Sequence, residues 1–248
     1  NNNDLYKKYV DSLGISPSKV NSLETIPYLP ISFFKTHDVV TTGFDPEITF
    51  ESSGTTGENT SRHLVKDLEL YDKSFKAAFK LFYGKPRDWC ILGLLPGYLE
   101  RKNSSLIRMV NELIKESNNA YSGFYLHNHD KLFQALARNE IIHQPTLLIG
   151  VTYALLDFAE KYPMKLQHTV VMETGGMKGK REEMTREEVQ DFLKKQLGLK
   201  LIQSEYGMTE LLSQGYSSGD GIFRTPPWMK ILVREYNDPF AIIANPKN

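Results

Sequence analysis

The sequence lacks the features that mark several large classes of protein. It has one cysteine, Cys90, so no internal disulfide can form, and no Cys/His cluster has the spacing of a zinc finger. The longest apolar run, residues 147–156, is interrupted by a threonine and is far shorter than the ~20 residues that span a bilayer. The first residues contain neither an apolar signal-peptide core nor an initiator methionine, which predicts that the true start lies elsewhere. We therefore expect a cytoplasmic protein without a membrane span.

Neither sign of charge is in excess. Lysine and arginine together number 30, as do aspartate and glutamate, so the net charge is zero. Without a global basic field, we expect no nucleic acid and no anionic membrane as the main partner. Hydrophobic residues make up 40% and charged residues 24% of the chain, and these ordinary values exclude disordered, collagen-like and coiled-coil proteins.

Strand and helix patterns alternate along most of the chain. Strands are predicted over residues 47–50, 62–66, 89–95, 146–150, 169–172 and 199–204. Helices are predicted over residues 68–82, 106–115, 131–138 and 151–161, and between a capping box at Thr185 and a stop at Gly198. This alternation predicts an α/β fold with mostly parallel sheets sandwiched by helices, whose sites lie on loops beyond the carboxyl ends of the strands. We expect one continuous unit over residues 1–248, with residues 1–45 as a helical or irregular lead-in.

A loop rich in hydroxyls and glycine directly follows the first predicted strand. It reads Ser52-Ser53-Gly54-Thr55-Thr56-Gly57. Glycines let backbone N–H groups approach an anion closely and the hydroxyls add donors, so this composition suits a polyphosphate. The Walker pattern is absent, as is any G-x-G-x-x-G after a strand. On composition alone, a polar surface loop explains the segment as well as a phosphate site does.

Two further loops follow later strands. Glu173-Thr174-Gly175-Gly176 contains two glycines that would let a flat ring lie against the backbone. Tyr206-Gly207-Met208-Thr209-Glu210 offers a carboxylate that could hold Mg²⁺ bridging phosphates and a tyrosine that could stack on a base. Taken alone, the first of these loops is explained by a tight turn, and a surface turn explains the second better than a binding site does. The occurrence of all three in this order favours a nucleotide site.

With these loops the chain resembles the adenylate-forming superfamily, the acyl-CoA synthetases and their relatives, whose signatures are S-S/G-G-T-T-G and, much later, Y-G-x-T-E. It is most similar to the LuxE-type acyl-protein synthetases and next to the phenylacetate-CoA ligases, through residues 26–30, 33–35, 51–57, 173–179 and 204–210. The resemblance covers nearly the whole chain. It implies the N-terminal adenylation core of such an enzyme, with the relatives' small C-terminal domain absent from this chain.

The resemblance implies an ATP-dependent ligase that uses Mg²⁺. A carboxylic acid, expected to be a long-chain fatty acid, would attack the α-phosphate of ATP to give an acyl-adenylate, and the acyl group would pass to a protein thiol. The alternatives are a phenylacetate-type CoA ligase, which would also use CoA, and a noncatalytic nucleotide-binding module. The implied partners are the acid and ATP, and an acyl-donor or acyl-reductase protein is a further candidate.

The resemblance also implies roles for individual residues. Glu210 would hold Mg²⁺ and Thr209 would reach the α-phosphate, so these two are the implied catalytic residues. The others would bind the nucleotide, with Ser52, Ser53, Gly54, Thr55, Thr56 and Gly57 at the phosphates and Gly175, Gly176 and Tyr206 around the adenine.

Two features limit how far the resemblance carries over, namely the residues after the signature loop and the single cysteine. Their signature loop often continues into a lysine after a proline, whereas residues 58–62 here read Glu-Asn-Thr-Ser-Arg, so a cation at this place must be Arg62 or come from elsewhere. LuxE-type enzymes carry the acyl group on a cysteine. Cys90, however, lies within a predicted apolar strand, so we expect it to be a core residue.

Overall fold

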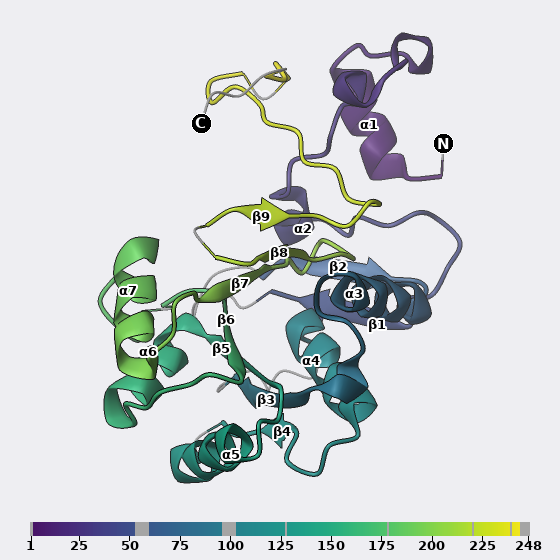
Figure 1. Cartoon of the computed structure of the whole chain (residues 1–248). Helices are drawn as coiled ribbons and strands as arrows, with labels where there is room; N and C mark the ends of the chain where they lie inside the picture. The colour runs from purple at the N-terminus through teal and green to yellow at the C-terminus, as the bar shows by residue number, and fades with distance from the viewer. Residues whose placement is uncertain are drawn as a thin grey trace.

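A seven-stranded sheet forms the centre of the molecule (Figure 1). The structure is a computed structural model that describes residues 2–52, 60–95, 103–126, 128–177, 179–219, 221–238 and 240–243. The strand order is β4 (Gly123–Phe124), β3 (Cys90–Leu94), β5 (Thr146–Val151), β6 (Thr169–Thr174), β7 (Gln203–Tyr206), β8 (Gly215–Ser217) and β9 (Phe223–Arg224). The first five strands are parallel and the last two are added antiparallel. The predicted α/β fold with a mostly parallel sheet is confirmed.

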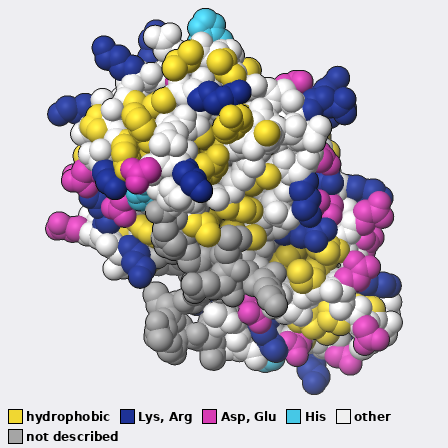
Figure 2. Space-filling view, turned by 90° about the horizontal axis from the view of Figure 1, so that it is seen from below, with side chains coloured by type: hydrophobic (Ala, Val, Ile, Leu, Met, Phe, Trp, Pro, Cys, Tyr) yellow, Lys and Arg dark blue, Asp and Glu magenta, His cyan; other side chains and the backbone are white. Residues whose placement is uncertain are grey.

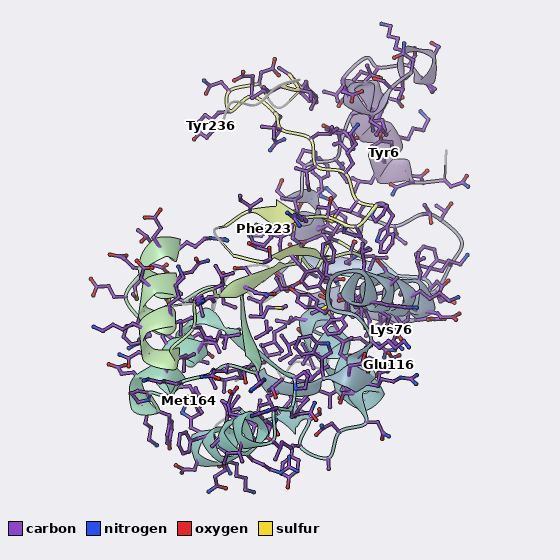
Figure 3. The ribbon with its side chains drawn as sticks, viewed as in Figure 1. Tyr6, Lys76, Glu116, Met164, Phe223 and Tyr236 are labelled. Carbon is purple, nitrogen blue, oxygen red and sulfur yellow. The ribbon has the colours of Figure 1, made fainter. Side chains whose placement is uncertain are left out.

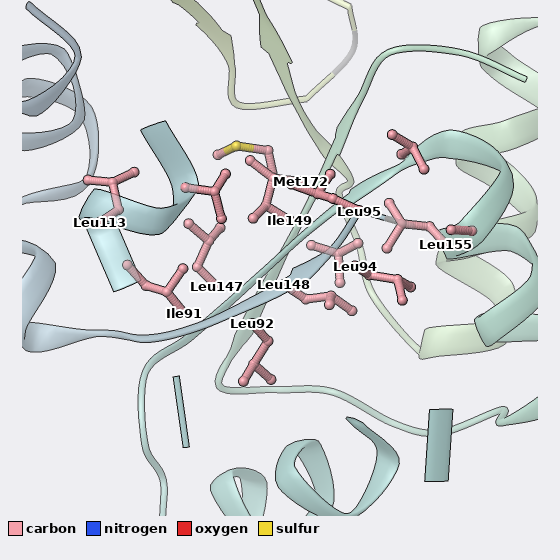
Figure 4. Close-up of a cluster of buried hydrophobic side chains, with 14 of the residues drawn as sticks. Ile91, Leu92, Leu94, Leu95, Leu113, Leu147, Leu148, Ile149, Leu155 and Met172 are labelled. Carbon is pink, nitrogen blue, oxygen red and sulfur yellow. The ribbon is translucent and has the colours of Figure 1, made fainter. Parts of the chain in front are cut away.

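Two neighbouring strands of the sheet, β3 and β5, are apolar because both of their faces are covered. Every residue of β3 and β5 is buried, as expected for parallel strands between layers of helices. Figure 4 shows Leu92, Leu148 and Ile149 within the cluster of buried side chains around these strands. Cys90, at the start of β3, is fully buried, which confirms it as a core residue.

Helices cover both faces of the sheet. α3 (Leu68–Tyr83) and α4 (Ser105–Ser117) lie on one side, while α5 (His129–Ile141), α6 (Thr152–Lys161) and α7 (Arg186–Leu197) lie on the other (Figure 1). This division follows from right-handed crossovers, because the β3–β4 connection runs along the sheet in the opposite direction to the connections that follow. An ion pair of 2.8 Å between Lys76 and Glu116 joins α3 to α4 (Figure 3).

A separate antiparallel pair precedes the main sheet. β1 (Ile48–Glu51) and β2 (Arg62–Val65) flank the hydroxyl-rich loop. The lead-in before them contains α1 (Asp4–Ser12), two short 3₁₀ turns, η1 (Pro17–Lys19) and η2 (Leu23–Thr25), and α2 (Phe33–Thr36). It contacts the segment after β9 through an ion pair of 3.6 Å between Glu24 and Lys230. Tyr6 of the lead-in and Tyr236 of the C-terminal segment lie toward the same end of the molecule (Figure 3).

Charged side chains of both signs are interspersed on the surface. In the described part of the face in Figure 2, Lys/Arg and Asp/Glu side chains lie side by side around the edges, with hydrophobic side chains between them. Throughout the described ranges, no helix combines the length and apolar character needed to cross a membrane.

The predicted elements are present, most boundaries agree within three residues, and the largest difference is at the start of β7. A strand was expected from residue 199, but β7 begins at Gln203. The reason is local: Gly198 has a left-handed backbone, and the Leu199 N–H donates to the Lys194 carbonyl (3.1 Å), so this residue still belongs to the end of α7. The short strands β4, β8 and β9 were not predicted.

Candidate functional site

A cavity of about 390 Å³ lies beyond the carboxyl ends of the parallel strands. Its walls come from the segments after β6 and β7, from the start of α4, which follows β3, and from the end of β1. Ligands of open α/β sheets bind at this edge of the sheet. We call this space the main cavity.

The glycines after β6 open one wall of the main cavity. Gly175 has a φ of 76°, a left-handed conformation that side chains disfavour. An added Cβ at Gly176 would meet no atom within 4 Å, so free space lies against the backbone there. Both glycines line the main cavity, and the binding of a flat ring against them stays a prediction.

The loops after β6 and β7 are joined by a buried carboxylate. The Thr174 hydroxyl, at the end of β6, donates to Oε2 of Glu205 on β7 (2.5 Å). The other oxygen, Oε1, lies 2.5 Å from the place where a Cβ on Gly207 would stand. A side chain at position 207 would therefore displace the Glu205 carboxylate.

Burial changes the acidity of Glu205. The net effect of its surroundings raises the pKa of Glu205 from 4.5 to about 7. Desolvation is the largest cause, the hydrogen bond from Thr174 lowers the pKa, and the neighbouring charge of Glu173 adds to the rise. Glu173 is itself buried and accepts hydrogen bonds from Ser204 (2.8 Å) and Thr152 (3.0 Å). Glu205 thus lies against the main cavity as an acid that titrates near neutral pH.

Thr209 and Glu210 are held at the rim by the other sheet. Nδ1 of His63, on β2, lies 2.9 Å from the backbone carbonyl of Thr209. Because a carbonyl only accepts, His63 must donate from Nδ1. Both Thr209 and Glu210 line the main cavity, and both are half-buried.

The start of α4 forms a further wall. Ser104 caps the helix, its Oγ accepting from the Ile107 N–H (3.4 Å), and Ser104, Ser105 and Leu106 line the main cavity. The first turn of a helix presents free N–H groups and the positive end of the helix dipole. This wall therefore favours an anion.

Only the first residue of the hydroxyl-rich loop can be placed. Ser52 lines the main cavity, and it forms two hydrogen bonds with Ser61, one from the Ser52 N–H (3.0 Å) and one to the Ser52 Oγ (2.9 Å). The predicted phosphate ligands Ser53, Gly54, Thr55, Thr56 and Gly57 lie outside the described residues.

Tyr206 is placed apart from the two glycines. Its ring is 43% exposed, its hydroxyl donates to the sulfur of Met208 (2.9 Å), and it lines a different cavity of about 760 Å³ between the lead-in and the C-terminal segment. Of the residues expected around adenine, Gly175 and Gly176 are therefore brought together in the main cavity, and Tyr206 is not.

The charges that line the main cavity are negative. Glu51, Glu205 and Glu210 contribute carboxylates, and none of its described lining residues is lysine or arginine. Arg62, the candidate replacement for the relatives' lysine, forms an exposed ion pair with Asp38. A cation for phosphate must therefore come from outside this set of side chains.

Several lining or supporting residues were not given roles in the sequence analysis, namely His63, Tyr71, Ser104, Glu205 and Gln214. Glu205 had a detectable signal, since it is a carboxylate within a strand directly before the Tyr-Gly-x-Thr-Glu motif. The others come from distant segments and are united only by the fold. A scan against models of known protein families gives no match, and a search of curated proteins gives none either.

Proposed function

We propose that the protein activates a carboxylic acid with ATP. A carboxylate oxygen would attack the α-phosphorus, the bond from that phosphorus to the bridging oxygen would break, and pyrophosphate would leave with the bonding electrons. The observation that carries the proposal is the meeting of Ser52, Gly175–Gly176 and Thr209–Glu210 in one cavity. These are the described members of the three loops on which the resemblance rests.

The polar walls suit a polyphosphate. Ser52, Ser104 and Thr209 bring hydroxyls, and the first turn of α4 adds the positive end of a helix. Donors fixed in advance by the fold stabilise charge that develops on phosphate oxygens without reorganising during the reaction. The protein's part in such a reaction is largely to position the two reactants.

The negative lining favours nucleotide that arrives with a divalent cation. Glu210 provides the hard oxygen ligand that Mg²⁺ prefers, and Mg²⁺ usually joins one or two carboxylates to substrate phosphates. Among the described residues no group of three His, Cys, Asp or Glu side chains is placed to hold a metal alone. This agrees with a cation shared with the substrate, which when bound would neutralise phosphate charge.

The finer expectations are proposals that rest on the resemblance. They are a long-chain fatty acid as substrate and a protein thiol as acceptor. The alternative acceptor is CoA. A noncatalytic nucleotide-binding module is favoured by the negative lining and the pairing of Arg62, and it is opposed by the gathering of Thr209 and Glu210 at the rim.

The test is acid-dependent exchange of labelled pyrophosphate into ATP, with short, aromatic and long-chain acids. We expect exchange with at least one acid, and Glu210→Gln should lower it by about 100-fold or more, because removal of a ligand that neutralises transition-state charge has effects of this order. The matched control is Glu187→Gln, an exposed position in the first turn of α7.

Two outcomes would count against the proposal. Unchanged exchange in a folded Glu210→Gln protein would remove Glu210 from the site. Absence of exchange with every acid, while MgATP still binds, would favour the noncatalytic module.

A further inference from the structure

Thr209 and Glu210 occupy the centre of a tight turn. The Leu211 N–H donates to the Met208 carbonyl (3.1 Å), which closes a turn with Thr209 and Glu210 at its two central positions. Met208, Thr209 and Glu210 all line the main cavity. The conformation of this turn therefore sets the directions in which the Thr209 hydroxyl and the Glu210 carboxylate leave the backbone.

Such a turn has two common arrangements, which differ in the orientation of its central peptide unit. In type I both central residues have negative φ, whereas in type II the second central residue has positive φ. Glu210 is that second residue, and it is not among the described residues with positive φ. The observed turn therefore does not have the type II arrangement.

His63 holds the central peptide unit of this turn. Its Nδ1 donates to the Thr209 carbonyl (2.9 Å), which is the acceptor of that peptide unit. Because the peptide unit is planar, fixing the carbonyl also fixes the Glu210 N–H, which points the opposite way. In the type II arrangement the carbonyl would turn away from His63 and the hydrogen bond would be lost. The bond thus stabilises the observed arrangement alone.

The imidazole ring of His63 is itself held in place. Phe34 of α2 packs edge to face against it, with ring centroids 5.7 Å apart. On β2, His63 is paired with Phe50 of β1, two residues before Ser52, which lines the main cavity. His63 is half-buried and does not line this cavity, so it can affect a ligand there only through the turn.

We propose that His63 is a positioning residue for the activation reaction, because the hydrogen bond from its Nδ1 keeps the turn in the arrangement that presents the Thr209 hydroxyl and the Glu210 carboxylate to the substrate phosphates and their cation. The inference rests on the proposed function and adds a residue that lies outside the three loops. A ring without a donor at position 63 would leave the Thr209 carbonyl unpaired, and the turn would shift to expose that carbonyl to water. Misplacement of a catalytic group by about 1 Å can lower the rate by about 100-fold.

The experiment separates the donated hydrogen bond from the packing of the ring. In His63→Asn the amide Nδ2 occupies the same place along the side chain as Nδ1 of histidine, so the donor is kept and the ring is lost. In His63→Phe the ring is kept and the donor is lost. The control is His168→Phe. His168 is also half-buried, packs against the ring of His143 (centroids 4.4 Å apart) and precedes β6, at the end of that strand away from the main cavity.

Each protein is assayed by acid-dependent pyrophosphate exchange, with rates expressed per folded molecule, and by hydrogen–deuterium exchange of the Leu211 N–H without ligand. We expect His63→Phe to lower kcat and kcat/KM for pyrophosphate exchange alike by about tenfold or more, as for groups that act in the transition state. Deuteration of the Leu211 N–H should accelerate by about fivefold, the factor that corresponds to one hydrogen bond of ordinary net strength. His63→Asn should retain both values within about threefold, since its donor remains. His168→Phe should leave both unchanged.

Three results would overturn the inference. If the unmodified chain catalyses pyrophosphate exchange and folded His63→Phe keeps its kcat, His63 does not position the turn, and the proposed function stands. Equal losses in His63→Asn and His63→Phe would assign the effect to ring packing instead of the hydrogen bond, and would also leave the proposed function intact. Absence of pyrophosphate exchange with every acid in the unmodified chain would count against the proposed function, and His63 would then have a structural role only, whatever the deuteration of Leu211 shows.

Discussion

Glu205 is the residue at which the two loops of the main cavity meet. One oxygen of its carboxyl group accepts a hydrogen bond from the Thr174 hydroxyl, and the other lies 2.5 Å from the place where a Cβ on Gly207 would stand. Because the carboxyl group is buried, the fold favours its neutral form. The acid is therefore a source of pH dependence in stability.

We expect the contribution of Glu205 to stability to fall as pH rises. Its pKa is about 7 in the folded protein against an ordinary 4.5, so the folded state retains the proton to higher pH. Its contribution is fully present below about pH 4.5 and is lost as pH rises through about 7, a change on the order of 3 kcal/mol. Urea denaturation at intervals from about pH 4.5 to about pH 8 should show Glu205→Gln losing less stability than the unmodified chain.

The matched control is Glu188→Gln in the capping box of α7. Hydrogen bonds from Thr185, chiefly from its backbone, lower the pKa of Glu188, so its contribution is present above the ordinary pKa and is lost as pH falls. The pH dependence that Glu188→Gln removes lies below about pH 4.5, so between about pH 4.5 and about pH 8 this variant should keep the profile of the unmodified chain. Parallel profiles for Glu205→Gln and the unmodified chain would contradict the assigned pKa.

At the scale of elements, the start of α4 has two tasks. Ser104 caps the helix, and it also lines the main cavity. Thr185 caps α7 in a similar way, through a hydrogen bond from the Glu188 N–H (3.2 Å), but it does not line that cavity. The two caps allow helix stability to be separated from ligand binding.

We expect Ser104→Ala and Thr185→Ala each to lower the free energy of unfolding by about 1 kcal/mol, because each removes a side-chain acceptor at a helix N-terminus. Only Ser104→Ala should also weaken the binding of MgATP. Urea denaturation and titration calorimetry would measure the two effects. Equal MgATP affinity in the two variants would show that the α4 wall does not contact the nucleotide.

The structural features that the sequence predicted are those whose physical cause lies within a few neighbouring residues. The cap at Thr185 and the stop at Gly198 are set within a few residues, and the structure confirms them. β8 and β9 are short and are defined by their antiparallel pairing with neighbouring strands, so the hydrophobic periodicity of the sequence did not predict them. In the site, the order of motifs predicted that Gly176 and Glu210 share a cavity. The partnership of Tyr71 with Gln214 arises only in the folded chain.

At the scale of the whole molecule, the balance of charge around the main cavity predicts how the fold responds to ligand. The lining carboxylates of Glu51 and Glu210 repel free polyphosphate. A ligand that binds only the folded state raises its stability by mass action. ATP should therefore stabilise the protein only in company with a divalent cation.

We expect MgATP at about 100 times its Kd to stabilise the fold by about 2.7 kcal/mol, seen as a rise in Tm. Addition of EDTA to the same sample should abolish the rise. Free Mg²⁺ alone should have less effect than MgATP, because Mg²⁺ usually joins one or two carboxylates to substrate phosphates and those phosphates are then missing. An equal rise in Tm with ATP in EDTA would contradict a cation shared with the nucleotide.

The main cavity is assembled from residues that lie far apart in the sequence. Its walls begin at Glu51 and are complete only at Gln214, and the bond from His63 to Thr209 joins residues 146 positions apart. Contacts between residues so far apart in sequence form slowly, because the entropy of closing a long loop is lost before the contacts contribute favourable energy. During synthesis, the cavity can appear only after the residues up to Gln214 have left the ribosome. Ligand binding therefore indicates that the segments between Glu51 and Gln214 have folded together.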